Sequence, residues 1–206
     1  MEIPSKLIQD AVNEFSRLPG IGKKTALRLV LHLLRQDKEK VRLFGEAVQR
    51  MRNEIRYCAN CHNISDGDIC LICQDHSRND QLICVVENFK EVIAIENTHQ
   101  FHGRYHILGG VISPVDGIGP DQLNIDSLCR RVKETGCREL VMALNPNMEG
   151  DTTVFYISKK INVPEVKITT ISRGVSFGGD LEYVDELTLG RSILSRLPYE
   201  KYLIDR

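Results

Sequence analysis

The chain starts with three stretches in which apolar residues recur at helical spacing. The first follows Ser5, a suitable N-cap, and stops at Pro19 and Gly20; the second starts at Lys23 and the third follows Asp37. Apolar residues of the third stretch are three or four positions apart, at Val41, Phe44, Val48, Met51 and Ile55. This pattern predicts three helices, the last with a face suited to packing on a partner helix.

Beyond residue 80 the pattern changes to short apolar runs that alternate with helical segments. Four runs are typical of buried strands, at 82–86, 105–108, 140–144 and 166–171. Helices are expected between and after them, at 91–99, 121–135, about 152–161 and 181–197. Such alternation predicts βαβ units and a mostly parallel sheet, so the expected fold class is α/β and multidomain with a C-terminal helical segment.

Length and charge narrow the class of protein. The 206 residues suffice for several small domains, and no apolar run approaches the ~20 residues of a membrane helix, so we expect no membrane partner. A net charge of −1 hides an asymmetry: residues 1–56 carry twelve Lys and Arg against seven Asp and Glu, whereas 57–206 carry fifteen against twenty-one. A basic segment joined to an acidic one favours a nucleic-acid partner.

The loop between the first two predicted helices has the residues of a phosphate-binding hairpin. Gly20 and Gly22 flank one apolar residue, which allows a tight turn whose amides face outward at the start of a helix. Lys23, Lys24 and Arg28 add positive charge there, so we expect sequence-independent binding to the DNA backbone by a helix-hairpin-helix. The alternative is a plain turn between helices. A nucleotide-binding P-loop is excluded because its first glycine and preceding strand are missing.

Four of the seven cysteines form two Cys-x-x-Cys pairs with eight residues between them, at Cys58, Cys61, Cys70 and Cys73. Two such pairs supply four thiolates to one tetrahedral ion, which predicts a single structural Zn²⁺ in a four-cysteine zinc finger. The alternatives are four unligated thiols or a redox pair. Reduced, metal-binding cysteines fit a cytoplasmic protein. Three further cysteines, Cys84, Cys129 and Cys137, are expected to be buried small residues.

Acidic residues follow two of the predicted strands. Glu87 ends the first strand of the α/β part, and Glu149 and Asp151 follow a later one. Because sites form at the carboxyl ends of parallel strands, these three carboxylates could meet around Mg²⁺. Solvated loop carboxylates are an equally good interpretation.

In their order along the chain, these parts resemble the bacterial recombination mediator family RecR. The resemblance extends from about Leu7 to Leu197 and rests on the hairpin, the four cysteines and several phrases of sequence. Those phrases include Val85-Val86-Glu87, Leu108-Gly109-Gly110, Ile112-Ser113-Pro114, Gly178-Gly179-Asp180-Leu181-Glu182-Tyr183 and Leu189-Gly190-Arg191.

The resemblance implies a DNA-repair accessory protein without enzymatic activity. Members of the family look like ring-shaped tetramers that act with RecO-type or RecF-type proteins to place RecA on gapped or single-stranded DNA. Four modules are implied: a helix-hairpin-helix at 1–56, a zinc finger at 57–76, a Toprim domain at 80–175, and a Walker B-like and helical segment at 176–206. In that last segment Asp180 and Glu182 would contact a partner or another subunit, with nucleotide binding as the alternative.

The resemblance to Toprim domains also bears on metal binding. Catalytic Toprim domains hold Mg²⁺ with one Glu and an Asp-x-Asp pair, and here Glu87 matches the Glu while Asn145 and Asn147 stand at the two Asp positions. Amides carry no charge, so we interpret Glu87, Glu149 and Asp151 as an acidic patch for a basic partner, with weak Mg²⁺ binding as the alternative. Two other functions stay open: a metal-dependent Toprim nuclease or primase-like enzyme, and a zinc-organised adaptor that touches only proteins.

Overall fold

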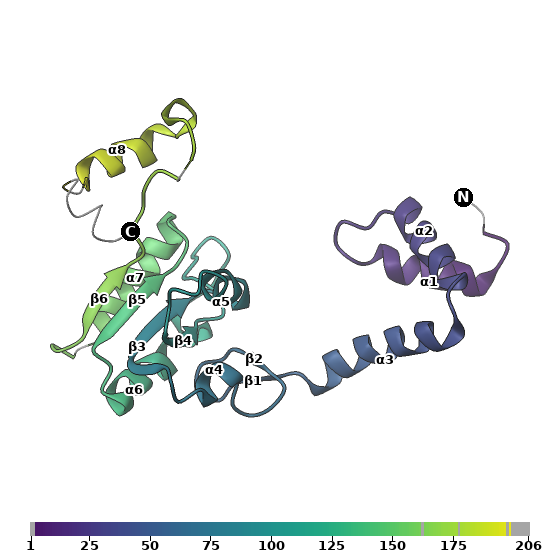
Figure 1. Cartoon of the computed structure of the whole chain (residues 1–206), viewed down its shortest axis with the longest axis horizontal. Coiled ribbons are helices and arrows are strands. Elements are labelled where there is room, and N and C mark those ends of the chain that lie inside the picture. The colour runs from purple at the N-terminus through teal and green to yellow at the C-terminus, as the bar shows by residue number, and fades with distance from the viewer. Residues whose placement is uncertain (1–2, 162, 177, 197, 199–206) are drawn as a thin grey trace. The chain divides into compact units, whose positions relative to one another are not determined.

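The computed structural model describes residues 3–161, 163–176, 178–196 and 198 (Figure 1). The chain divides into two compact units, Met1–Ile55 and Arg56–Arg206, and each is described by itself. Within the described residues, no helix combines the length and the hydropathy needed to cross a membrane.

The first unit contains the three predicted helices, α1 (Lys6–Ser16), α2 (Lys23–Leu34) and α3 (Lys38–Glu54). The expected caps are present, since the Ser5 side chain accepts a hydrogen bond from the Ile8 amide and Asp37 accepts one from Glu39. Val12 of α1 packs against Ala26 and Val30 of α2 in a small core. No residue of α3 is buried within the described chain, and its side chains Phe44, Val48 and Met51 are about half exposed.

The second unit is built on a four-stranded sheet of β3 (Asn79–Val86), β4 (Gly103–Ile107), β5 (Glu139–Ala143) and β6 (Lys167–Thr170). Its order is β4-β3-β5-β6 and all three pairings are parallel, which confirms the predicted mostly parallel sheet. Strand β4 pairs with one edge of β3, and the next strand, β5, pairs with the other edge of β3. A topological switch point therefore lies between β3 and β5, where their carboxyl ends can hold a site.

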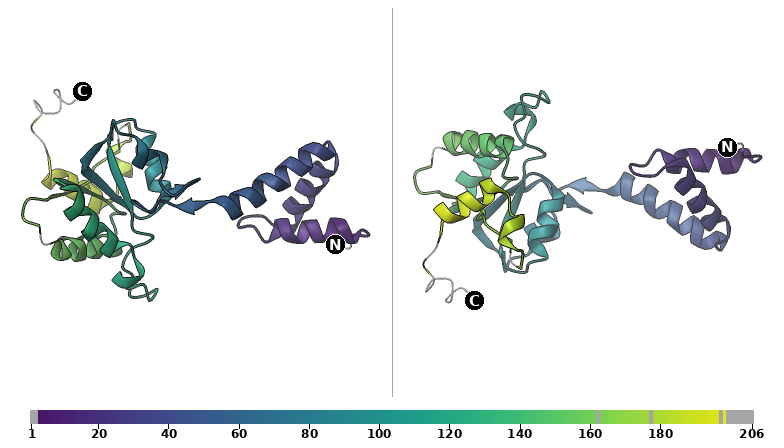
Figure 2. Two further views of the ribbon diagram at one scale, coloured as in Figure 1. Left: turned by 90° about the horizontal axis from the view of Figure 1, so that it is seen from below. Right: turned by 90° about the horizontal axis from the view of Figure 1, so that it is seen from above.

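Helices cover both faces of this sheet (Figure 2). On one face α6 (Ile125–Thr135) and α7 (Met148–Lys160) bury Leu128 and Ile157 against Ile83 and Leu140. On the other face α5 (Phe89–Glu96) packs Val92 with Cys84, Val86 and Tyr105. A 3-10 turn, η1 (Pro120–Gln122), precedes α6, so that helix starts later than expected. Helix α7 starts earlier than expected because the Asn147 side chain caps it by accepting from the Gly150 amide.

The four-cysteine segment forms β1 (Arg56–Tyr57), β2 (Ile64–Ser65) and the one-turn helix α4 (Leu71–Gln74). Strands β1 and β2 pair antiparallel, with Tyr57 opposite Ile64. Ile72 of α4 contacts both the cysteine cluster and the sheet core on the α5 face. The segment is thus continuous with the Toprim-like core rather than a separate body.

The prediction of one helix over residues 181–197 is wrong. A 3-10 turn, η2 (Leu181–Tyr183), is followed by a separate helix, α8 (Glu186–Leu194), and residue 197 lies outside the described residues. Asp185 causes the break, because its extended backbone and its side-chain bond to the Thr188 amide make it the N-cap of α8.

Candidate functional site

The hairpin between α1 and α2 has the local geometry of an anion site. Gly20 has a φ of +77°, a left-handed conformation that favours glycine, and the Ile21 amide closes the turn on the Leu18 carbonyl at 3.1 Å. Gly22 then starts α2 in an extended conformation, and in the described chain it provides no side-chain cap. The first-turn amides of α2 are therefore available, together with the positive end of the helix dipole.

Three basic side chains lie on the first two turns of α2. Lys23, Lys24 and Arg28 are all exposed, and none takes part in an ion pair among the residues that the structure describes. Lys24 and Arg28 are four positions apart on α2 and so lie on the same helix face. All five predicted hairpin residues, from Gly20 to Arg28, are thus exposed and lie in the hairpin turn or in the first two turns of α2.

The four cysteines form one cluster, as the spacing predicts. All four Sγ atoms lie within 4.8 Å of one another, and the Sγ atoms of Cys61 and Cys70 are 3.5 Å apart. Cys58, Cys61 and Cys70 are buried, and four thiolates on one tetrahedral ion would leave no open position for a substrate. This donor set fits a tetrahedral structural zinc site.

The thiols contact one another closely enough to affect their ionisation. Hydrogen bonding to Cys70, then to Cys73, and burial together raise the pKa of Cys61. A divalent ion would stabilise all four groups as thiolates, so metal binding would also release protons.

Backbone hydrogen bonds shape the first cysteine pair. The Cys58 amide donates to the Asn63 carbonyl at 2.7 Å, and the His62 amide donates to the Cys58 carbonyl at 2.9 Å. His62 closes this turn with a positive φ of 62°. Its side chain points to the neighbouring core, where it bonds Ser127 at 2.8 Å and lies edge-on to the ring of His106. His62 is therefore bound to α6 rather than to the cysteine cluster.

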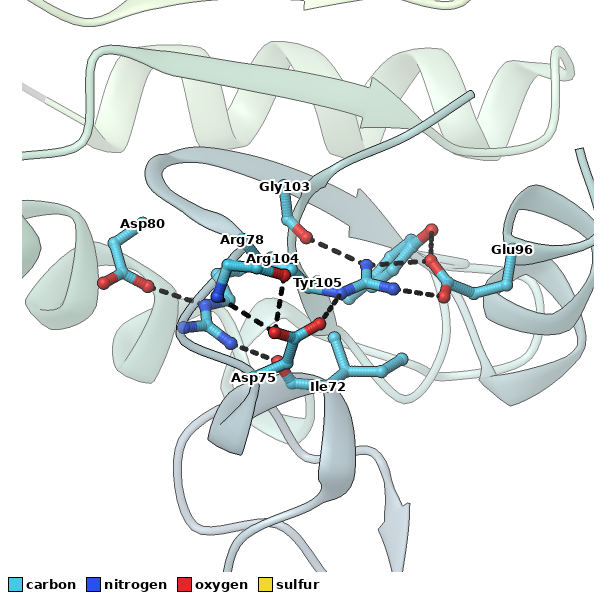
Figure 3. A network of polar contacts seen from close by, with 9 residues as sticks. Ile72, Asp75, Arg78, Asp80, Glu96, Gly103, Arg104 and Tyr105 are labelled. Carbon is cyan, nitrogen blue, oxygen red and sulfur yellow. Dashed lines mark hydrogen bonds and ion pairs between the residues drawn. The ribbon is translucent and has the colours of Figure 1, made fainter. Parts of the chain in front are cut away.

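Two contacts fasten the cysteine segment to the edge strand β4. The Ile107 amide donates to the Cys61 carbonyl at 2.9 Å. Arg104, only 4% exposed, donates to the Ile72 carbonyl and pairs with Asp80 at 2.6 Å (Figure 3). The zinc-finger segment therefore lies on the free edge of the sheet and satisfies its Ile107 amide.

A second arginine extends this network along β4. Arg78 donates to the Gly103 carbonyl at 3.2 Å and pairs with Glu96, which also accepts from the Tyr105 hydroxyl at 2.7 Å (Figure 3). Burial acts to raise the pKa of Glu96, but the hydrogen bonds from Arg78 and Tyr105 outweigh it, so the pKa of Glu96 is lowered. No signal in the sequence marks these residues, because Arg78 and Arg104 resemble ordinary surface charges.

The three predicted acids lie at the carboxyl edge of the sheet but have different partners. Glu87, after β3, accepts a hydrogen bond from the Asn145 side-chain amide at 2.8 Å. Glu149 accepts from the Ser113 hydroxyl at 3.1 Å. Asp151 forms an ion pair with Arg173, whose guanidinium lowers the pKa of Asp151. Among the His, Cys, Asp and Glu side chains of the described residues, the four cysteines are the one group of three or more that lie close enough together to hold an ion.

The C-terminal acids are exposed. Asp180 precedes η2 and Glu182 lies within it. A cavity of about 500 Å³ lies beside this segment, between α8 and the ends of β5 and β6, and Arg173, Thr188 and Arg191 line it. Neither Asp180 nor Glu182 lines this cavity.

Family models match four successive parts of the chain. They are described as the RecR helix-hairpin-helix (residues 8–52), the RecR four-cysteine zinc finger domain (55–75), the Toprim domain (81–172) and the RecR C-terminal region (174–196). The order of these parts is the order expected from the sequence.

Full-length relatives give the same result. The chain is 59% identical over 201 residues to Recombination protein RecR of Flavobacterium johnsoniae, with 98% of each chain covered. It is 54% identical to the protein of the same name from Cytophaga hutchinsonii, with 97% of this chain and 98% of the relative covered. It is also 54% identical to the protein of that name from Bacteroides fragilis, with 96% of this chain and 97% of the relative covered. These are names of a recombination protein rather than of an enzyme, in agreement with the interpretation as a binding protein. The chain belongs to the RecR family of recombination proteins.

Proposed function

We propose that this protein binds the DNA backbone through its hairpin and acts as a mediator in recombinational repair. The observation that carries the proposal is the uncapped start of α2 beside the exposed side chains of Lys23, Lys24 and Arg28, in the part of the chain that the structure describes. Amides and cations of this kind bind phosphate without reading base sequence. The role in recombination follows from the family.

The same proposal includes a ring. Phe44, Val48 and Met51 leave an apolar stripe on α3, which suits pairing with a second copy of the helix. A homotetramer closed in this way would place the hairpins' cations around a shared hole and hold DNA as a clamp. RecO-type and RecF-type proteins would be its partners in loading RecA on gapped DNA.

The cysteine cluster would hold one structural Zn²⁺ per chain through Cys58, Cys61, Cys70 and Cys73. The modules would extend over 1–56, 57–76, 80–175 and 176–206. Since Ile72 and Cys61 also contact the Toprim domain, the metal would support that domain as well as its own loop.

The Toprim acids would serve as a contact surface for a basic partner rather than as a catalytic metal site. Glu87 already accepts from the Asn145 amide, and Asp151 is neutralised by Arg173. An amide donor and a guanidinium are poor neighbours for Mg²⁺, which prefers anionic oxygen ligands. Asp180 and Glu182 would likewise contact a partner or another subunit.

The experiment is a double substitution, Lys23→Ala with Arg28→Ala, in the full chain. We expect lower DNA affinity and a plot of log affinity against log salt whose slope is less negative by about 2, because two phosphate contacts are lost. The matched control is Lys38→Ala with Lys40→Ala, which removes the same charge from exposed positions of α3. Equal affinity and slope for the hairpin variant and the wild type, with and without a RecO-type partner, would refute the hairpin assignment.

The enzymatic alternative has its own test. Protein loaded with Mg²⁺ or Mn²⁺ would be incubated with single-stranded, duplex and gapped DNA. Metal-dependent cleavage or synthesis that Glu87→Gln abolishes would replace the binding function with a catalytic one.

A further inference from the structure

A groove of about 700 Å³ lies where the zinc-finger hairpin meets the Toprim domain. Its lining includes Tyr57 and Ile64 of the β1–β2 pair and Phe89 and Lys90 at the start of α5. Ile107 and Gly109, at the end of β4, are also in its lining. We name it the Tyr57 groove, and all of its lining belongs to the unit Arg56–Arg206.

The β1–β2 hairpin of the zinc finger presents two apolar side chains to the Tyr57 groove. Tyr57 and Ile64 are directly opposite each other in the β1–β2 pair, so their side chains lie next to each other on one face. Tyr57 is 74% exposed, and among the described residues no aromatic ring packs on it. The Cys58–Asn63 hydrogen bond fixes the base of the hairpin, so the ring of Tyr57 stands on a rigid support.

The part of the lining that α5 supplies is also held by hydrogen bonds. Asn88 caps α5 in a capping box, with its side chain accepting from the Lys90 amide at 2.8 Å and its own amide donating to Glu91 at 2.8 Å. These bonds satisfy the polar groups at the helix start and hold Phe89 at the edge of the groove. Gly109 contributes no side chain, and its amide is already bonded to the Glu87 carbonyl at 3.0 Å.

The charge of the Tyr57 groove differs from that of its surroundings. Residues 57–206 carry fifteen basic and twenty-one acidic side chains, yet none of the described residues that line the groove is acidic. The one formally charged side chain in the lining is Lys90, which is exposed and pairs with no carboxylate in the described chain. The lining combines the aromatic rings of Tyr57 and Phe89 and the cation of Lys90 with the polar side chains of His62, Asn88 and Asn124. Aromatic rings and a cation complement a flat base that carries an anionic backbone.

We propose that the Tyr57 groove binds an unpaired nucleotide of single-stranded DNA, with the base stacked on Tyr57 and the phosphate beside Lys90. This inference rests on the proposed DNA-binding function and adds a second site of different chemistry. The helix-hairpin-helix of the first unit would hold the backbone of any DNA, whereas the Tyr57 groove would require a base that is free to leave its stack. The protein would then distinguish the single-stranded part of a gap from the duplex beside it.

The test compares Tyr57→Ala with Tyr57→Trp in the full chain, and with Tyr183→Ala as the matched control, because Tyr183 is also exposed, at 80%. Affinities for an oligodeoxythymidine and for a duplex of equal length are measured at the same salt concentration. Loss of one stacked base predicts about 5- to 100-fold weaker binding of the single strand by Tyr57→Ala, with duplex binding unchanged. Tyr57→Trp and Tyr183→Ala should bind as the wild type does. Light-induced crosslinking of 5-iododeoxyuridine DNA should modify Tyr57 or Phe89.

Two results would overturn the inference. The first is wild-type single-strand affinity in Tyr57→Ala. The proposed function is intact in that case if Lys23→Ala with Arg28→Ala still weakens binding, and a change of oligomeric mass in Tyr57→Ala would then make the groove a contact between copies of the chain. The second is an equal loss for duplex and single strand in Tyr57→Ala, which would make Tyr57 a general backbone contact. If Tyr57→Ala weakens single-strand binding while Lys23→Ala with Arg28→Ala binds as the wild type does, the assignment of the helix-hairpin-helix fails and the groove stands.

Discussion

The side-chain amide of Asn145 donates a hydrogen bond of 2.8 Å to the carboxylate of Glu87, across the carboxyl ends of two neighbouring strands. An aspartate at position 145 could not donate this bond and would instead repel Glu87. Two carboxylates at these positions would need a bound cation to offset their repulsion, whereas the hydrogen bond holds Asn145 and Glu87 together without one.

We therefore predict that Asn145→Asp with Asn147→Asp creates dependence on a divalent ion. Without Mg²⁺ the variant should lose about 1 kcal/mol of unfolding free energy, because a charge-assisted bond becomes a repulsion at an exposed site. Its melting temperature should be about 2–4 °C below that of the wild type and should recover on addition of Mg²⁺. Thermal melting of both proteins in Mg²⁺ and in chelator measures this. A wild type that gains as much from Mg²⁺ as the variant would show that the natural site already binds the ion.

Gly150 lies close to the backbone of Asn145. A Cβ atom on Gly150 would overlap the carbonyl oxygen of Asn145, which is a backbone atom and cannot turn aside as the end of a flexible side chain can. We predict that Gly150→Ala lowers the free energy of unfolding by about 1–3 kcal/mol through overpacking. Gly45→Ala is the control, since no atom lies within 4 Å of a Cβ at Gly45 in α3. It should stabilise the chain by about 0.5–1 kcal/mol, and urea denaturation that shows equal effects would contradict the packing argument.

Much of the fold is predictable because its signals are local. Ser5 and Asp37 cap the helices that follow them, and the apolar spacing of each helix lies within one stretch of sequence. The zinc-finger cluster is equally local, since four cysteines within sixteen positions can reach one ion. Where a local signal was missed, as with Asp185 before α8, the predicted helix merged two elements into one.

Contacts between distant residues are not predictable in this way. Arg104 becomes buried because the Ile72 carbonyl, thirty-two positions earlier, accepts its hydrogen bond. Asp151 follows a strand end as predicted, yet Arg173, twenty-two positions later, takes up its charge. Neither partner is marked by composition or periodicity, and both appear only once the sheet brings the segments together.

The contact between Cys61 and Ile107 leads to a prediction for metal removal. Chelation of zinc should loosen the Cys61 carbonyl and expose the Ile107 amide, which donates to it at 2.9 Å. Hydrogen–deuterium exchange in β4 should therefore accelerate at least tenfold at peptides that contain Ile107, equivalent to about 1.4 kcal/mol of lost protection. Exchange in α1 and α2, which belong to the other compact unit, should not change. Unchanged exchange at Ile107 in metal-free protein would show that the zinc-finger segment keeps its contact without the ion.

His106 makes the stability of the second unit sensitive to acid. It is fully buried, its Nε2 is 2.8 Å from the Asn124 carbonyl, and its Nδ1 has no hydrogen-bond partner among the described residues. Burial lowers the pKa of His106 from 6.5 to about 3, and the charge of Arg131 acts in the same direction. Below pH 6.5 the unfolded chain binds a proton that the folded chain excludes. Stability from this group is therefore lost as pH falls from 6.5 toward 3.

The matching prediction compares the wild type with His106→Gln, which keeps an amide donor for the Asn124 carbonyl but does not titrate. Between pH 6.5 and 5.5 the wild type should lose about 1 kcal/mol more unfolding free energy than the variant, because the unfolded histidine is half protonated at pH 6.5 and almost fully protonated at pH 5.5. The other histidines and the carboxylates are present in both proteins, so the difference between the two proteins is assigned to His106. Urea denaturation at the two pH values measures it, and parallel losses in both proteins would mean that the imidazole is protonated without unfolding.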